Sequence, residues 1–176
     1  RTDFSDASVG RDRISHKEER GYEVLQGEGK VRGELLGGCL ESLYDILKGT
    51  RHSDEKETCE KYGIFPEKEI WKDKILFIET CEEKPEPEMF RKELRALKER
   101  EVFEAIAGII VGKPQDEAYY EYYKPILVDV VGNKKLPILY NVNFGHAHPK
   151  CILPYGAQAE LDLDNKKINI IESMFD

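Results

Sequence analysis

The chain has 176 residues, of which 40% are hydrophobic and 35% are charged, a balance that fits one soluble domain with a sizeable core. Its formal net charge of -8, without a long basic run, argues against a nucleic-acid groove or an anionic membrane surface as its partner. No apolar stretch is long enough to span a bilayer, and residues 1–10 lack the apolar core of a signal peptide.

The cysteines lie at positions 39, 59, 81 and 151. They form no Cys-x-x-Cys pair, and their spacings fit no zinc module. A chain of this length does not need disulfides to fold. We therefore expect reduced thiols in a cytoplasmic protein.

The first half of the chain mixes short strands with turns. Residues 1–21 are polar and predict a loop or arm. Strands are expected at 22–25 and 30–35, and the glycine-rich turn between them indicates a hairpin. Gly37 and Gly38 would then open a helix over 39–47, which Gly49 ends. The charged stretch 50–70 is expected to be an irregular surface insertion.

The second half alternates apolar runs with amphipathic segments. The run Lys74–Glu79 is typical of a strand buried on both faces. Further strands are expected at 105–111, 136–142, 153–163 and 167–172, and helices at 88–100 and at 116–131, the latter interrupted at Pro125. This order predicts an α/β domain with a mixed sheet or a partly closed barrel.

Two segments could carry chemistry. Glu79 ends a buried strand, and ligands of open α/β sheets gather beyond such strand ends; the alternative is a carboxylate that merely meets solvent. Asn143–Pro149 directly follows another predicted strand and contains His146 beside Gly145. Histidine is the usual general base near neutral pH. A polar loop, or a metal site shared by His146 and His148, is the alternative there.

A hydrolytic pair of Glu79 and His146 requires a nucleophile. The serines lie at 5, 8, 15, 42, 53 and 173, and none is in a Gly-x-Ser-x-Gly turn. Cys81 is an alternative nucleophile, although the acidic residues Glu82 and Glu83 that follow it would raise its pKa.

Several motifs, in order along the chain, resemble one family. They are Gly33-Glu34-Leu35-Leu36-Gly37-Gly38, Ile75-Leu76-Phe77-Ile78-Glu79-Thr80, Gly108-Ile109-Ile110-Val111-Gly112-Lys113-Pro114, Asn141-Val142-Asn143-Phe144-Gly145-His146 and Leu153-Pro154-Tyr155-Gly156. The chain is similar to the C-terminal domain of the serine-type LD-carboxypeptidases, which include murein tetrapeptide carboxypeptidases and the microcin C self-immunity peptidases.

The resemblance implies a swivelling β/β/α-type domain that supplies Glu and His to a Ser-Glu-His triad. These residues match Glu79 and His146, and the nucleophilic Ser belongs to a separate N-terminal domain. Residues 1–21 would then be an arm or linker from that missing domain, and residues 22–176 the C-terminal domain. Gly37, Gly38 and Asn143 are candidate substrate contacts. Cys39 departs from the Asn that many relatives carry after the glycine pair.

The resemblance also implies hydrolysis of an amide that follows an L-configured centre, in a murein tetrapeptide or a peptidyl-nucleotide. It implies a cytoplasmic homodimer that needs no metal or cofactor and binds neither nucleic acid nor membrane. This chain without its serine is expected to be inactive. A non-catalytic binding module, or a cysteine- or metal-dependent hydrolase, remains the alternative.

Overall fold

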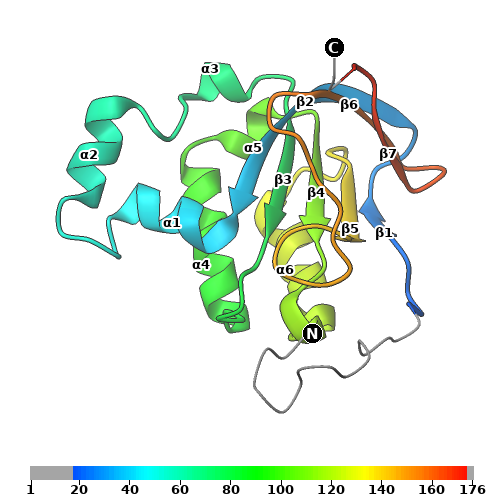
Figure 1. The fold of residues 1–176 in the computed structure, drawn as a ribbon, viewed down its shortest axis with the longest axis horizontal. Helices are drawn as coiled ribbons and strands as arrows, with labels where there is room; N and C mark the ends of the chain where they lie inside the picture. The colour runs from blue at the N-terminus through cyan, green and yellow to red at the C-terminus, as the bar shows by residue number, and fades with distance from the viewer. Residues whose placement is uncertain (1–17, 174–176) are drawn as a thin grey trace, which may run out of the picture.

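The computed structural model describes residues 18–173, and these form a mixed seven-stranded sheet with helices packed on one face. The strand order is β1-β5-β4-β3-β2-β6-β7. The strands are Glu23–Gln26 (β1), Lys30–Cys39 (β2), Ile75–Glu79 (β3), Gly108–Gly112 (β4), Ile138–Val142 (β5), Gln158–Asp162 (β6) and Lys167–Ile170 (β7). Figure 1 shows β6 and β7 curling away from the central strands, which makes the sheet a half-barrel. The expected α/β class with a mixed, partly closed sheet is confirmed.

The centre of the sheet is parallel and its flanks are antiparallel. Strands β2, β3, β4 and β5 run parallel to one another, whereas β1 pairs antiparallel with β5 and β6 pairs antiparallel with β2. The long strand β2 joins the two parts, because Lys30–Glu34 pairs with β6 and Leu35–Cys39 pairs with β3. The parallel strands therefore end at one common edge.

Alternation along the central strands gives the sheet a core on each face. In β3, Leu76 and Ile78 face the helices, while Ile75 and Phe77 face the layer formed with β6 and the β5–β6 loop. All five residues of β3 are buried, as the continuous apolar run predicted.

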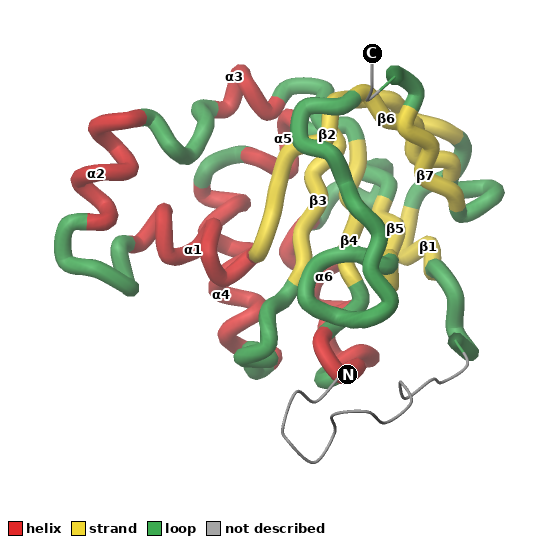
Figure 2. Tube along the Cα trace, viewed as in Figure 1, coloured by secondary structure: helices red, strands yellow, loops and turns green. Residues whose placement is uncertain are grey.

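The helices are α1 (Leu40–Lys48), α2 (Glu55–Tyr62), α3 (Lys68–Trp71), α4 (Pro87–Glu99), α5 (Val102–Ala105), the short 3-10 turn η2 (Gln115–Glu117) and α6 (Tyr120–Val131). The expected helix at 88–100 is confirmed as α4, with Leu94 and Leu97 fully buried. Gly49 ends α1 in the left-handed conformation, as predicted. Figure 2 shows α2 and α3 set to one side of the sheet. No helix among residues 18–173 combines the length and apolar character needed to cross a membrane.

Two predictions about the first strands and the glycine pair that follows them are wrong. The segments 22–25 and 30–35 do not form a hairpin, because β1 pairs with β5 at the opposite edge of the sheet from β6 and β7. Gly37 and Gly38 do not open a helix but complete β2, with φ values of 156° and 150° that favour glycine. A Cβ on Gly37 would run into the carbonyl of Phe77 on the neighbouring strand. The glycine pair thus permits close approach of two strands.

Three further expectations, for residues 50–70, 105–111 and 116–131, differ from the structure. The region 50–70 contains α2 and α3, and Cys59 and Trp71 anchor these helices on the core. Residues 102–105 form α5, so β4 begins only at Gly108. Helix α6 continues through the exposed Pro125, which removes one backbone hydrogen bond while the buried face of the helix stays packed.

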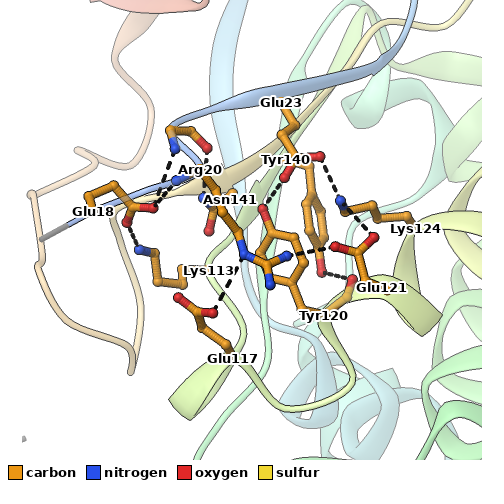
Figure 3. A network of polar contacts seen from close by, with 11 residues as sticks. Glu18, Arg20, Glu23, Lys113, Glu117, Tyr120, Glu121, Lys124, Tyr140 and Asn141 are labelled. Atoms are coloured by element: carbon orange, nitrogen blue, oxygen red, sulfur yellow. Dashed lines mark hydrogen bonds and ion pairs between the residues drawn. The ribbon is translucent and has the colours of Figure 1, made fainter.

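The described end of the predicted arm, residues 18–21, is held against the domain (Figure 3). The carboxylate of Glu18 accepts a hydrogen bond from Lys113, whose side chain is buried. The guanidinium of Arg20 lies 3.9 Å from the ring centre of Tyr120 and donates to Glu121 at 2.6 Å. The segment therefore packs on the end of β4 and on α6. The rest of the predicted arm, residues 1–17, lies outside the described residues.

Candidate active site

The site is organised around a contact between Glu79 and His146. Nδ1 of His146 lies 3.0 Å and 2.9 Å from the two carboxylate oxygens of Glu79, and the backbone N–H of His146 donates to Oε2 at 3.1 Å. A carboxylate only accepts hydrogen bonds, so Nδ1 carries the proton in this contact. The two residues that the sequence singled out therefore form a hydrogen-bonded carboxylate–imidazole pair.

The sheet explains how residues 67 positions apart meet. Glu79 ends β3, and His146 lies in the loop that follows β5, with β4 between these two parallel strands. Both residues consequently reach the edge where the parallel strands end. The structure thus brings the acid and the imidazole together at this edge.

Two glycines make the slot that holds Glu79. A Cβ on Gly145 would lie 2.5 Å from Oε2 of Glu79, and Gly145 has a φ of +85° that favours glycine. A Cβ on Gly112 would lie 2.6 Å from Cβ of Glu79. Real Cβ atoms essentially never come so close to other atoms. The Glu79 side chain therefore fits between these two positions because both are glycine.

The two halves of the pair differ in exposure. The Glu79 side chain is 6% exposed, and the His146 ring is 43% exposed. Nε2 of His146 lies 3.3 Å from Oε2 of Glu82, an acid whose own side chain is 64% exposed. The ring is thus held on its Nδ1 side by a buried partner, while its Nε2 side faces the exposed carboxylate of Glu82.

A cavity of about 280 Å³ adjoins the pair. Its walls come from the ends of β2 and β3 and from the β5–β6 loop; they are Gly38, Cys39, Phe77, Glu79, Phe144, Gly145, Cys151, Leu153 and Tyr155. The ring of Phe77 packs edge-on against Phe144 and Tyr155, with ring centres 5.8 Å and 4.9 Å apart. The cavity therefore has an apolar floor and a carboxylate–imidazole pair at its side.

The three predicted substrate contacts differ in where they lie relative to the cavity. Gly38 lines the cavity, and Gly37 lies one residue earlier, where its carbonyl accepts the hydroxyl hydrogen of Tyr155. The carbonyl of Asn143 accepts the N–H of Cys151 at 2.6 Å, and its buried Oδ1 has no hydrogen-bond partner among the described residues. Sequence reasoning missed Tyr155 as a cavity residue, although it stands in one of the quoted motifs.

The cysteines are free thiols, and those near the site are poor nucleophiles. Burial is the largest of the factors that raise the pKa of Cys39 to about 11, and burial together with the charge of Glu41 raises the pKa of Cys81 to about 12. A thiol with such a pKa is protonated at neutral pH and does not attack a carbonyl. This argues against Cys81 as the nucleophile that partners His146.

Metal ligation by His146 and His148 also finds no support in the geometry. Nδ1 of His146 is engaged by Glu79. Among residues 18–173, the side chains that lie close enough to share one ion are Cys39, Glu41 and Cys81, and this group contains neither histidine.

The fold and the site together define a class of domain: a mixed α/β half-barrel with a carboxylate–histidine pair at the ends of its parallel strands. The sequence model of one protein family, the LD-carboxypeptidase C-terminal domain, matches residues 32–161. The chain belongs to this family.

Relatives and solved structures agree with this assignment. The chain is 30% identical over 156 residues to the microcin C7 self-immunity protein MccF of Escherichia coli, which covers 85% of this chain and 39% of that protein. It is 46% identical to an MccF-like protein from Streptococcus pneumoniae solved in complex with AMP, with a TM-score of 0.89 over 96% of this chain and 48% of that one. MccF in complex with aspartyl sulfamoyl adenosine superposes with a TM-score of 0.69 at 26% identity, over 99% of this chain and 48% of that one. The chain thus spans about half the length of the relatives it matches.

Proposed function

We propose that this chain supplies the general base and its orienting carboxylate to a serine-type LD-carboxypeptidase or related amidase. The observation that carries the proposal is the contact of Nδ1 of His146 with both oxygens of the buried Glu79, in a domain of this family. The carboxylate fixes the tautomer in which Nε2 accepts a proton, and it stabilises the imidazolium that forms.

In the proposed reaction a serine hydroxyl attacks the scissile carbonyl while Nε2 of His146 takes its proton. His146 then returns the proton to the leaving amine, and an acyl-enzyme remains until water repeats the cycle. The serine would come from a second domain, corresponding to the half of the relatives that this chain does not cover. Glu82 would leave Nε2 when the serine approaches.

For the substrate we propose an amide between an L-configured residue and either a terminal D-amino acid or a nucleotide-like amine. The second class is favoured by the AMP complex of the Streptococcus pneumoniae protein and by the aspartyl sulfamoyl adenosine complex of MccF. The aromatic floor of the cavity, formed by Phe77 and its neighbours, suits a ligand with an apolar or planar part. On the strength of the family resemblance we further propose a cytoplasmic homodimer.

The test compares the chain alone with a protein in which it is joined to a serine-bearing N-terminal domain of this family. The substrates are an aminoacyl sulfamoyl adenosine and a murein tetrapeptide. We expect no turnover from the chain alone. The joined protein should hydrolyse one of the two substrates, and His146→Ala should lower kcat by about 10⁴-fold or more.

A His148→Ala variant of the joined protein is the matched control, because His148 lies in the same loop without the Glu79 contact. It should retain activity. Turnover by the isolated chain that disappears with His146→Ala would place the nucleophile within the chain and overturn the proposal. Full activity of the joined protein after His146→Ala would overturn it as well.

A further inference from the structure

A second group of reactive side chains lies beside the Glu79–His146 pair: the two thiols and the carboxylate of Cys39, Glu41 and Cys81. Their ligand atoms all lie within 4.8 Å of one another. Sγ of Cys39 is 3.3 Å from Oε2 of Glu41, and Oε1 of Glu41 accepts the backbone N–H of Cys81 at 2.9 Å. One carboxylate therefore contacts Cys39 through its sulfur and Cys81 through its backbone N–H.

The parallel pairing of β2 and β3 creates this group. Cys39 lies opposite Glu79 in the register, so Cys81, two residues beyond Glu79, emerges at the same edge. Glu41 is in the first turn of α1, directly after β2. Three residues from two separate segments thus converge without any local sequence motif, and rigid elements hold two of them.

The set of donors is chemically selective. Thiolates are preferred ligands of zinc, and a carboxylate oxygen is a common third ligand. Two sulfurs bound to one tetrahedral zinc at about 2.3 Å lie about 3.8 Å apart, which is within the 4.8 Å that spans the ligand atoms here. All three residues are half-buried, which leaves them reachable by an ion from solvent. We propose that Cys39, Glu41 and Cys81 form a Zn²⁺ site with two thiolates, one carboxylate and a fourth position open to water.

Binding has a defined proton balance. Each thiol gives up its proton to solvent as its sulfur binds Zn²⁺, while the carboxylate is already ionised, so two protons are released for each ion. The local charge is then the same before and after binding, because two new thiolate charges offset the two charges of the ion.

The site adjoins the cavity, because Cys39 belongs to both. A zinc ion there would stand at the cavity wall that β2 supplies. Zinc binding at this place is separate from the proposed action of Glu79 and His146, and its test does not depend on the proposed peptidase activity.

The test uses the full 176-residue chain, freed of metal and kept in a non-thiol reductant. After Zn²⁺ is added and the excess removed, we expect one Zn²⁺ per chain by elemental analysis. Titration of the metal-free chain with Zn²⁺ in weakly buffered solution should release two protons per ion. Co²⁺ as a spectroscopic probe should give thiolate-to-cobalt charge-transfer absorption in the near ultraviolet. Because this part uses the unaltered chain, it does not depend on whether a variant folds.

Variants then locate the ion. Cys39→Ser and Cys81→Ser should each weaken zinc binding by roughly 100-fold or more, and Glu41→Gln by roughly 10-fold or more. Cys151→Ser, at an exposed thiol, should bind zinc as the unaltered chain does. Failure of the unaltered chain to bind one zinc, a cobalt spectrum without thiolate bands, or zinc binding that survives both Cys39→Ser and Cys81→Ser would each overturn the proposal.

Discussion

Glu93 should make the stability of the domain fall as pH rises. It lies on α4 with only 1% of its surface exposed, and its Oε2 has no hydrogen-bond partner among the described residues. Burial, together with the charges of Glu41, Asp45 and Glu83, raises its pKa from 4.5 to about 8. The folded chain thus holds a proton that the unfolded chain loses above pH 4.5, so stability is lost progressively between about pH 4.5 and 8.

The size of the effect follows from the shift. The difference between 8 and 4.5 is 3.5 pKa units, and each unit corresponds to about 1.36 kcal/mol, which gives roughly 5 kcal/mol at and above pH 8 and roughly 3 kcal/mol at pH 7. Glu93→Gln keeps the shape of the neutral carboxyl and has no charge to bury. The variant should therefore match the unaltered chain near pH 5 and exceed its free energy of unfolding by several kcal/mol at pH 9.

Urea unfolding at several pH values, with chelator present, measures this difference. The single tryptophan, Trp71, is buried and reports the transition by fluorescence. Glu88→Gln on the same helix is the control, because its side chain is 82% exposed and its substitution should give a small difference that does not vary with pH. A Glu93→Gln difference that stays constant from pH 5 to 9 would show that no buried proton is held there.

Three further substitutions test the packing around the site. Gly145→Ala should displace the Glu79 carboxylate, cost about 1–3 kcal/mol of stability and shift the NMR resonances of the His146 imidazole. As a control, an alanine at the exposed Gly63 should leave those resonances unchanged. Unshifted imidazole resonances in Gly145→Ala would contradict the steric argument. Glu18→Gln should destabilise the fold by about 1–3 kcal/mol at pH 7, because Lys113 stays buried without its carboxylate. Hydrogen bonding from Lys113 lowers the pKa of Glu18 to about 2, so this difference should vanish as pH falls from 4.5 toward 2, and a difference independent of pH would refute it. Tyr155→Phe should lower the urea midpoint modestly through loss of the bond to the Gly37 carbonyl, and an unchanged midpoint would show that the bond contributes nothing.

The contact between Glu79 and His146 was predictable because the two residues follow strongly apolar runs. Such runs form the buried centre of a parallel sheet, and their carboxyl ends share one edge, so an acid after one and a histidine after another are brought together. This prediction did not require knowing which residues pair with one another across the sheet. The same reasoning placed α4, since its apolar residues recur at helical spacing.

Features that depend on pairing between distant segments were not predictable. The β1 strand pairs with the outer edge of β5 rather than with β2, its neighbour in sequence, whose partners are β6 over residues 30–34 and β3 over residues 35–39. The glycine pair at 37 and 38 has the composition of a turn, and only the neighbouring Phe77 carbonyl explains why a strand needs glycine there. Cys39 and Cys81 lie close together through the β2–β3 register, which their spacing along the chain does not reveal.

The protonation of the His146 ring tests the central claim most directly, because the mechanism requires Glu79 to hold the proton on Nδ1. Nitrogen-15 NMR of the imidazole groups, recorded above the pH at which the ring is charged, distinguishes the two tautomers. We expect a single Nδ1–H tautomer for His146 that becomes mixed in Glu79→Gln, with His148 unaffected by the substitution. An Nε2–H tautomer in the unaltered chain, or a tautomer indifferent to Glu79→Gln, would contradict the assignment of His146 as a base oriented by Glu79.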